Sequence, residues 1–242
     1  RQHPFPCEDE SIRQLNPLSS CLPLEGNMDK TISNADPQVA KVRTLLAHDF
    51  AKGVSEATPC ASARMMEQAA SCGSGVEKAL FEHVALVLSS HRAQFTMQVD
   101  HSVRRRFDDR LDCPADSFSH SGCFSVGAIR LFEDLGMLEE LEREQAVGRL
   151  RGQFRKELLA LTRRMRKLLG RERMPEAHNP VFPRVLLRAF ADALANLGFD
   201  TRARRLALSV YGPLLDQIIA NVYARVIAAL TMIPNTATQA ID

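Results

Sequence analysis

Hydrophobic residues recur along most of this chain at intervals of three or four positions. Between residues 74 and 111 the recurring positions are Leu80, Val84, Val87, His91, Phe95, Val99, Val103 and Phe107. Between residues 126 and 170 they are Leu150, Phe154, Leu158, Leu161, Met165 and Leu168. This spacing places the side chains on one face of a helix. No segment alternates as a half-buried strand does, so the pattern predicts an all-α fold, a multi-helix bundle of long amphipathic helices.

Capping and helix-breaking residues set the expected ends of these helices. Asp36-Pro37 is a helix opening, because aspartate caps the first amides and proline fits the first turn. Gly53, Gly170 and Gly198 mark expected ends, and Gly212-Pro213 predicts a kink. The expected helices span residues 37–52, 62–71, 74–111, 126–170 with a break at 136, 184–197 and 201–232. Residues 114–125 are rich in serine and are expected to form a loop.

The first part of the chain differs from the rest. Residues 1–36 hold four prolines and show no apolar period, which predicts an irregular Pro-rich N-terminal arm. Residues 37–242 are then expected to form a single helical domain. The apolar stretch 214–233 is interrupted by Asp216, Asn221 and Arg225, so we expect a buried core helix and no membrane partner.

Composition narrows the function classes. The six cysteines form no CxxC pair and residues 1–34 hold no apolar core of a signal peptide, which favours a reduced, cytoplasmic protein. A net charge of +2 is too small to imply a polyanionic partner. The sequence has no P-loop, GxGxxG, HExxH or nucleophile elbow. We therefore predict no catalytic residue and no cofactor.

The helix expected over residues 126–170 carries a basic row. Acidic residues crowd its start and basic ones its end, a polarity that stabilises a helix through its macrodipole. Arg149, Lys156, Arg163 and Lys167 share one face, and such fixed positive charge can follow the phosphates of a nucleic acid. The competing interpretation is a solvated face whose long side chains cover apolar surface.

A second group resembles a nucleotide site. Arg105, Arg106 and Arg110, followed by Ser119 and Gly122, resemble the RRxxxR and DxSxxG motifs by which PilZ domains hold cyclic di-GMP. However, this chain has Ser117 where the second motif begins with Asp. In addition, no barrel strands surround the two motifs. A run of arginines on a helix is the competing interpretation.

Two sets of residues in the sequence could act as metal ligands. Cys113, His120 and Cys123 lie in one expected loop and offer zinc ligands, although the loop lacks a fourth. Scattered buried cysteines are the alternative. His48-Asp49 resembles the paired ligands of helical HD-type metal phosphohydrolases, whose further ligands we cannot place. His91 lies on the apolar stripe and is expected to be a hydrogen-bonded core residue.

The C-terminal third, about residues 155–233, resembles a known family. The matching residues are Leu168-Leu169-Gly170, Asn179-Pro180, Leu186-Leu187, Ala189-Phe190, Ala193-Leu194, Leu206, Leu208 and Tyr211. They are similar to an uncharacterised bacterial family of helical proteins of unknown function, whose members are sometimes labelled thymidine phosphorylase. No phosphate-binding glycine loop supports that label here, and no catalytic residue carries over. Some members occur beside cyclic di-GMP modules, which favours regulation.

These observations favour a non-enzymatic bacterial regulatory or adaptor protein whose partner is another protein. One alternative is a protein that responds to a cyclic dinucleotide or binds nucleic acid through an arginine-rich helix. A second is a metal-dependent helical phosphohydrolase centred on His48 and Asp49. The stripe from Leu150 to Leu168 is equally compatible with a homo-oligomer and with packing inside the bundle.

Overall fold

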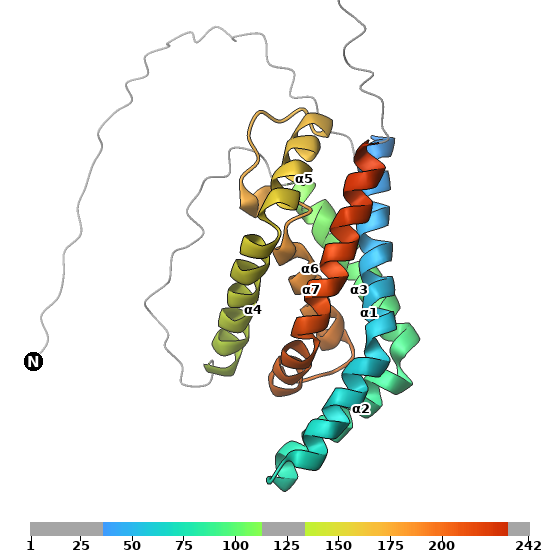
Figure 1. The fold of residues 1–242 in the computed structure, drawn as a ribbon, viewed down its shortest axis with the longest axis vertical. Coiled ribbons are helices and arrows are strands. Elements are labelled where there is room, and N and C mark those ends of the chain that lie inside the picture. The colour runs from blue at the N-terminus through green and yellow to red at the C-terminus, as the bar shows by residue number, and fades with distance from the viewer. Residues whose placement is uncertain (1–35, 113–133, 232–242) are drawn as a thin grey trace, which may run out of the picture. The chain divides into compact units, whose positions relative to one another are not determined.

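The computed structural model describes residues 36–112 and 134–231, and all of them belong to one unit of the chain, Ile32–Asp242. These residues form seven α-helices and one short 3-10 helix, and no strand (Figure 1). The elements are α1 (Pro37–Ser71), α2 (Gly75–Ser90), α3 (Arg92–Leu111), α4 (Asp134–Gln153), α5 (Arg155–Leu168), η1 (Glu176–His178), α6 (Pro183–Asn196) and α7 (Thr201–Thr231). The predicted all-α bundle is confirmed. The expected N-terminal arm, residues 1–36, lies outside the described residues except for Asp36.

Helix α1 is continuous where two shorter helices were expected. Asp36 caps it as expected, because its carboxylate accepts a hydrogen bond of 2.8 Å from the Gln38 amide. The predicted end at Gly53 is wrong, since the helix runs through both Gly53 and Pro59. A Cβ atom at residue 53 would lie 2.7 Å from Cγ2 of Ile218 on α7. This glycine therefore allows two helices to approach closely and does not end one.

The single helix expected over residues 74–111 is two helices, α2 and α3, that meet at His91. The His91 backbone leaves the helical region, with φ −107° and ψ 24°, and its side chain is exposed. The prediction that His91 lies in the core is therefore wrong, because the turn directs the imidazole away from the bundle. Val84, Phe95 and Val99 of the same stripe are fully buried.

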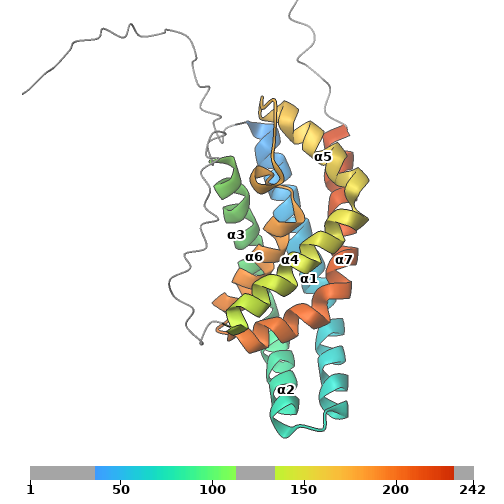
Figure 2. The same ribbon diagram turned by 90° about the vertical axis from the view of Figure 1, so that its left-hand side faces the viewer.

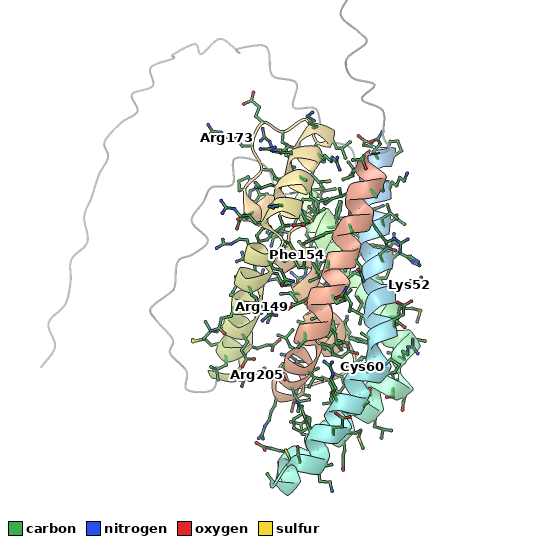
Figure 3. All side chains as sticks on the ribbon, in the orientation of Figure 1. Lys52, Cys60, Arg149, Phe154, Arg173 and Arg205 are labelled. Carbon is green, nitrogen blue, oxygen red and sulfur yellow. The ribbon has the colours of Figure 1, made fainter. Side chains whose placement is uncertain are left out.

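The break expected at Gly136 is also wrong, because Gly136 lies inside α4 and the chain turns instead at Phe154. Figure 3 labels Phe154, which is buried. Its ring packs edge-on against Tyr223 of α7, with centroids 5.8 Å apart. Gly170, with φ 60°, follows the end of α5 as expected. Tertiary packing at Phe154 thus decides where this long helical stretch bends.

The last two helices form the centre of the bundle. Helix α6 agrees with prediction to within one residue at each end, and most of its side chains are buried. Helix α7 changes direction along its length (Figure 2), and Gly212-Pro213 accounts for the bend. By length and composition α7 is apolar enough to cross a membrane. In the structure Ile219, Tyr223 and Val226 of this helix are fully buried against the other helices, and 39% of its most apolar window is buried.

Two tyrosines on α7 place hydroxyl groups in the core. The Tyr211 hydroxyl donates a 2.9 Å hydrogen bond to Oγ1 of Thr58 on α1, whose own hydroxyl donates to the Val54 carbonyl. The Tyr223 hydroxyl donates to the Val181 carbonyl at 2.9 Å. Burial raises the pKa of Tyr211 to about 12 and that of Tyr223 well above its ordinary value. Both hydroxyls therefore stay protonated and join α7 to its neighbours.

Ion pairs attach α4 to α6 and α7. Four of these pairs use glutamates of α4, namely Glu139 with Arg204, Glu140 with Arg188, Glu142 with Arg205 and Glu144 with Arg184, and a fifth joins Arg149 to Asp216. Glu139 is the most buried of these carboxylates, with a side chain 7% exposed, and Arg143 on its own helix also contacts it. The acidic start of this helical stretch thus forms tertiary contacts in addition to its favourable polarity along the helix axis.

Adjacent arginines on α7 offer a matched test of these pairs. We expect Arg204→Ala to lower the free energy of unfolding by about 2 kcal/mol or more, because it deprives a buried carboxylate of its main partner. Arg205→Ala removes the partner of the more exposed Glu142 and should cost about 1 kcal/mol or less. Urea unfolding measures both variants, and equal losses would contradict the role of burial.

Tyr211→Phe should lower stability at pH 7 by about 1 kcal/mol, since the buried bond to Thr58 is lost. It should also flatten the fall of stability in alkali. In the unfolded chain tyrosine ionises near pH 10, whereas in the folded protein Tyr211 does so at about 12, so the native state loses stability as the pH rises from 10 to 12. Urea unfolding between pH 7 and 11 checks both effects, and identical pH profiles for wild type and variant would contradict the second.

Candidate binding groove

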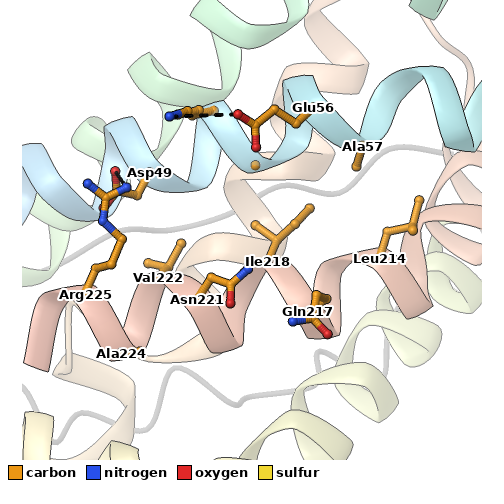
Figure 4. A pocket seen from close by; sticks show the side chains of 12 residues that line it. Asp49, Glu56, Ala57, Leu214, Gln217, Ile218, Asn221, Val222, Ala224 and Arg225 are labelled. Atoms are coloured by element: carbon orange, nitrogen blue, oxygen red, sulfur yellow. Dashed lines mark ion pairs between the residues drawn. The ribbon is translucent and has the colours of Figure 1, made fainter.

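Helices α1 and α7 run antiparallel and leave between them a groove with a volume of about 530 Å³ (Figure 4). Ligand sites in proteins have volumes of this order. The groove is lined by Asp49, Lys52, Gly53, Glu56 and Ala57 from α1 and by Leu214, Gln217, Ile218, Asn221, Val222, Ala224 and Arg225 from α7.

The helical repeat explains how these residues come together. On both helices the lining positions recur at steps of three and four, so each helix presents one stripe to the groove. Gly53 lies against Ile218, and these two with Ala57 and Val222 form an apolar floor. Charged and amide side chains stand along the margins, as Figure 4 shows. The groove combines apolar contact with polar groups that can orient a bound molecule.

Asp49 lies at one end of the groove opposite Arg225. The aspartate side chain is 3% exposed and the arginine side chain 58%, and Nη1 of Arg225 lies 2.8 Å from Oδ1 of Asp49. Despite this distance, neither carboxylate oxygen accepts a hydrogen bond of normal geometry from any described residue. The contact is therefore an electrostatic attraction without a directional bond, and the acceptor capacity of a buried carboxylate is left unused.

The polar residues on the margins of the groove, unlike Asp49, are exposed. Lys52 and Glu56 form an ion pair of 3.9 Å along α1, and both side chains are more than half exposed. Exposed pairs of this kind contribute little to stability. Gln217 and Asn221 are exposed on the α7 side. The chemistry that the lining residues offer is charge, hydrogen bonding and apolar contact.

A second cavity, of about 370 Å³, lies between α4, α6 and α7. Its walls include Leu150, Leu187 and Leu215. Its charged residues are engaged, since Arg149 donates to Asp216 at 3.1 Å and Arg205 pairs with Glu142. It therefore lacks the unused buried acceptor that distinguishes the groove between α1 and α7.

The histidine and aspartate suggested as metal ligands differ in exposure. His48 is exposed whereas its neighbour Asp49 is buried in the groove, because successive residues leave a helix in different directions. Within the described ranges no three His, Cys, Asp or Glu side chains are grouped as metal ligands would be. Cys113, His120 and Cys123 lie outside these ranges, so the zinc site stays a prediction.

The arginines of the suggested nucleotide site hold helices together. Arg105 and Arg106 both donate to Asp192 on α6, at 2.9 and 2.8 Å. Arg110 donates to the Ala177 carbonyl in η1. These bonds fix α3 to its neighbours and would compete with a bound phosphate. Ser119 and Gly122, the other half of the suggested site, lie outside the described residues.

The basic row is divided by the turn at Phe154. Lys156, Arg163 and Lys167 are exposed on α5, where no described carboxylate forms an ion pair with them. Arg149 belongs to α4 and pairs with Asp216. The helix break separates Arg149 from the other three, which a sequence pattern that treats the region as one helix does not foresee.

Residues 35–231 match the family described as "Protein of unknown function (DUF1631) N-terminal domain". The chain belongs to this DUF1631 family. The match extends far beyond the C-terminal third, residues 155–233, and the family description assigns no activity. No curated protein and no solved structure matches the chain.

The pair at the end of the groove makes a testable contribution to stability. Because a buried ion pair is often no better than uncharged residues, the double variant Asp49→Leu/Arg225→Gln of this DUF1631 domain should unfold at the wild-type urea concentration or be more stable by about 1–2 kcal/mol. Arg225→Gln alone leaves the buried carboxylate uncompensated and should be less stable than the double variant. A double variant less stable than wild type by more than about 2 kcal/mol would mean that the pair holds α1 to α7.

Proposed function

We propose that this DUF1631 domain is a non-enzymatic, cytoplasmic regulatory or adaptor module that binds a helix of a partner protein in the groove between α1 and α7. The observation that carries the proposal is the combination of an apolar floor with a buried Asp49 whose oxygens accept no hydrogen bond of normal geometry from the described residues. Arg225 compensates the charge of this carboxylate, and a partner that supplies well-aligned donors would also satisfy its hydrogen bonds.

The form of the groove favours a helical occupant. Two antiparallel helices with lining residues at steps of three and four form a furrow into which the ridge of a third helix fits. The stretch from Asp49 to Ala57 is about 12 Å long at 1.5 Å per residue, which matches about two turns of a partner helix. Small residues at Gly53, Ala57 and Ala224 leave room for close approach.

A second candidate function is nucleic-acid binding through α5. It rests on the exposed Lys156, Arg163 and Lys167, which meet no described carboxylate in an ion pair. With Arg155, which is also exposed, α5 offers four such cations. Four cations still neutralise few phosphates, and affinity grows with the number neutralised. Protein binding in the groove is therefore the function better supported.

Site-specific cross-linking in cells of the native host tests the groove directly. A photo-reactive amino acid at the exposed position Gln217 should form a discrete adduct with one protein, whereas the same group at Gln145, exposed on α4, should not. Ala224→Arg places a bulky charge in the groove at an exposed position and should abolish the adduct. Ala70→Arg, an equally exposed alanine near the end of α1, is the matched control and should leave it unchanged.

The alternatives give different adducts. Cross-linking that survives Ala224→Arg, or that is equal at Gln145, would reject the groove as the binding site. An adduct with the mass of two copies of this chain would replace the partner with self-association. An adduct that disappears on nuclease treatment would favour the basic residues of α5 and nucleic acid.

A further inference from the structure

Among the described carboxylates Asp49 is an exception. Asp108 accepts two hydrogen bonds of 2.9 Å from Arg43, and Asp192 accepts three from two arginines. Glu139, the only comparably buried acid in the described ranges, accepts bonds from Arg143 and Arg204. Asp49 is as buried as Glu139, yet both of its oxygens stay without a hydrogen bond.

The missing partner must be a donor. An ionised carboxylate only accepts hydrogen bonds, and two oxygens offer about four lone-pair positions. A charged donor compensates the buried negative charge as well, and a guanidinium can reach both oxygens at once. The side chains with these properties are arginine and lysine. A basic side chain on the bound helix therefore fits this end of the groove.

Arg225 occupies the position that such a group would take. Its guanidinium lies 2.8 Å from Oδ1, but the geometry makes no hydrogen bond, and the side chain is 58% exposed on a long flexible stem. Holding an exposed arginine in one place gives little net stabilisation, because side-chain entropy and water oppose it. A better aligned cation therefore displaces Arg225 at small cost.

We infer that Asp49 is the anchor for an arginine or lysine side chain of the partner helix, and that Arg225 covers this anchor when the groove is empty. The inference rests on the proposed function and adds the chemistry of the partner. It assigns opposite roles to two residues in contact, since Asp49 binds the incoming cation and Arg225 competes with it. The opposite arrangement, in which Arg225 binds an anion, would leave the buried acceptors of Asp49 without hydrogen bonds.

Titration with butylguanidinium, an analogue of the arginine side chain, tests the anchor on the full chain. Amide chemical shifts in NMR spectra at low salt should change at residues 49–57 and 214–225 and saturate. Asp49→Asn keeps the shape of the side chain and should weaken binding by about tenfold or more, because a charge-assisted bond is lost. Asp216→Asn, which alters a carboxylate on α7 outside this groove, should leave the affinity unchanged.

Arg225→Gln gives an independent readout that damage to the fold does not imitate. If Arg225 competes for the anchor, its removal should tighten butylguanidinium binding by several-fold. Pentanoate, an anion of similar length, should not bind to either protein. Binding of pentanoate that is lost in Arg225→Gln would overturn the inference, as would butylguanidinium shifts that Asp49→Asn does not affect.

Failure of the anchor and failure of the groove are distinguishable. If the cross-link at Gln217 persists while butylguanidinium does not bind, the partner uses the groove without the Asp49 anchor, and this inference is wrong. If butylguanidinium binds through Asp49 but no protein cross-links at Gln217, the anchor stands and the proposed adaptor function is wrong.

Discussion

The close antiparallel contact between α1 and α7 supports the rest of this structure. It depends on the absence of a side chain at Gly53, where any Cβ atom would meet Ile218 at 2.7 Å. Further along, the hydrogen bond from Tyr211 to Thr58 joins the same two helices inside the core. With this spacing the two facing stripes of side chains form the groove and bring Asp49 to Arg225, which lies near the other end of the chain.

The bundle uses charge in two ways. Around α4 and α3, carboxylates and arginines form well-aligned pairs, of which Glu139 with Arg204 and Asp192 with Arg106 are examples, and these pairs attach helices to one another. In the groove, the buried Asp49 faces an exposed arginine without a hydrogen bond. Buried polar groups in folded proteins are almost always bonded, and exceptions concentrate where a ligand or partner completes them. Among the carboxylates of the described residues this contrast is specific to Asp49, and it supports the groove as the candidate site.

Membership of the DUF1631 family adds no activity to this description. The proposed docking role rests on the lining residues of the groove, which offer one buried carboxylate, balanced charges on the margins and an apolar floor. The arginines that resemble a nucleotide motif hold α3 to α6, and the turn at Phe154 separates Arg149 from the exposed cations of α5. A regulatory module that docks a helix is consistent with all of these features.

The sequence by itself determined the helical class, most of the buried positions and those helix ends that local chemistry fixes, such as the cap at Asp36 and the positive-φ glycines at 170 and 198. Periodicity and capping depend on residues only a few positions apart, so both can be recognised in the sequence. Only the tertiary structure decided that Gly53 joins two helices, that the chain turns at His91 and Phe154, and that Asp49 meets Arg225. These features depend on which distant helices pack together, and neither the spacing of apolar residues nor the local preference of any one residue contains that information.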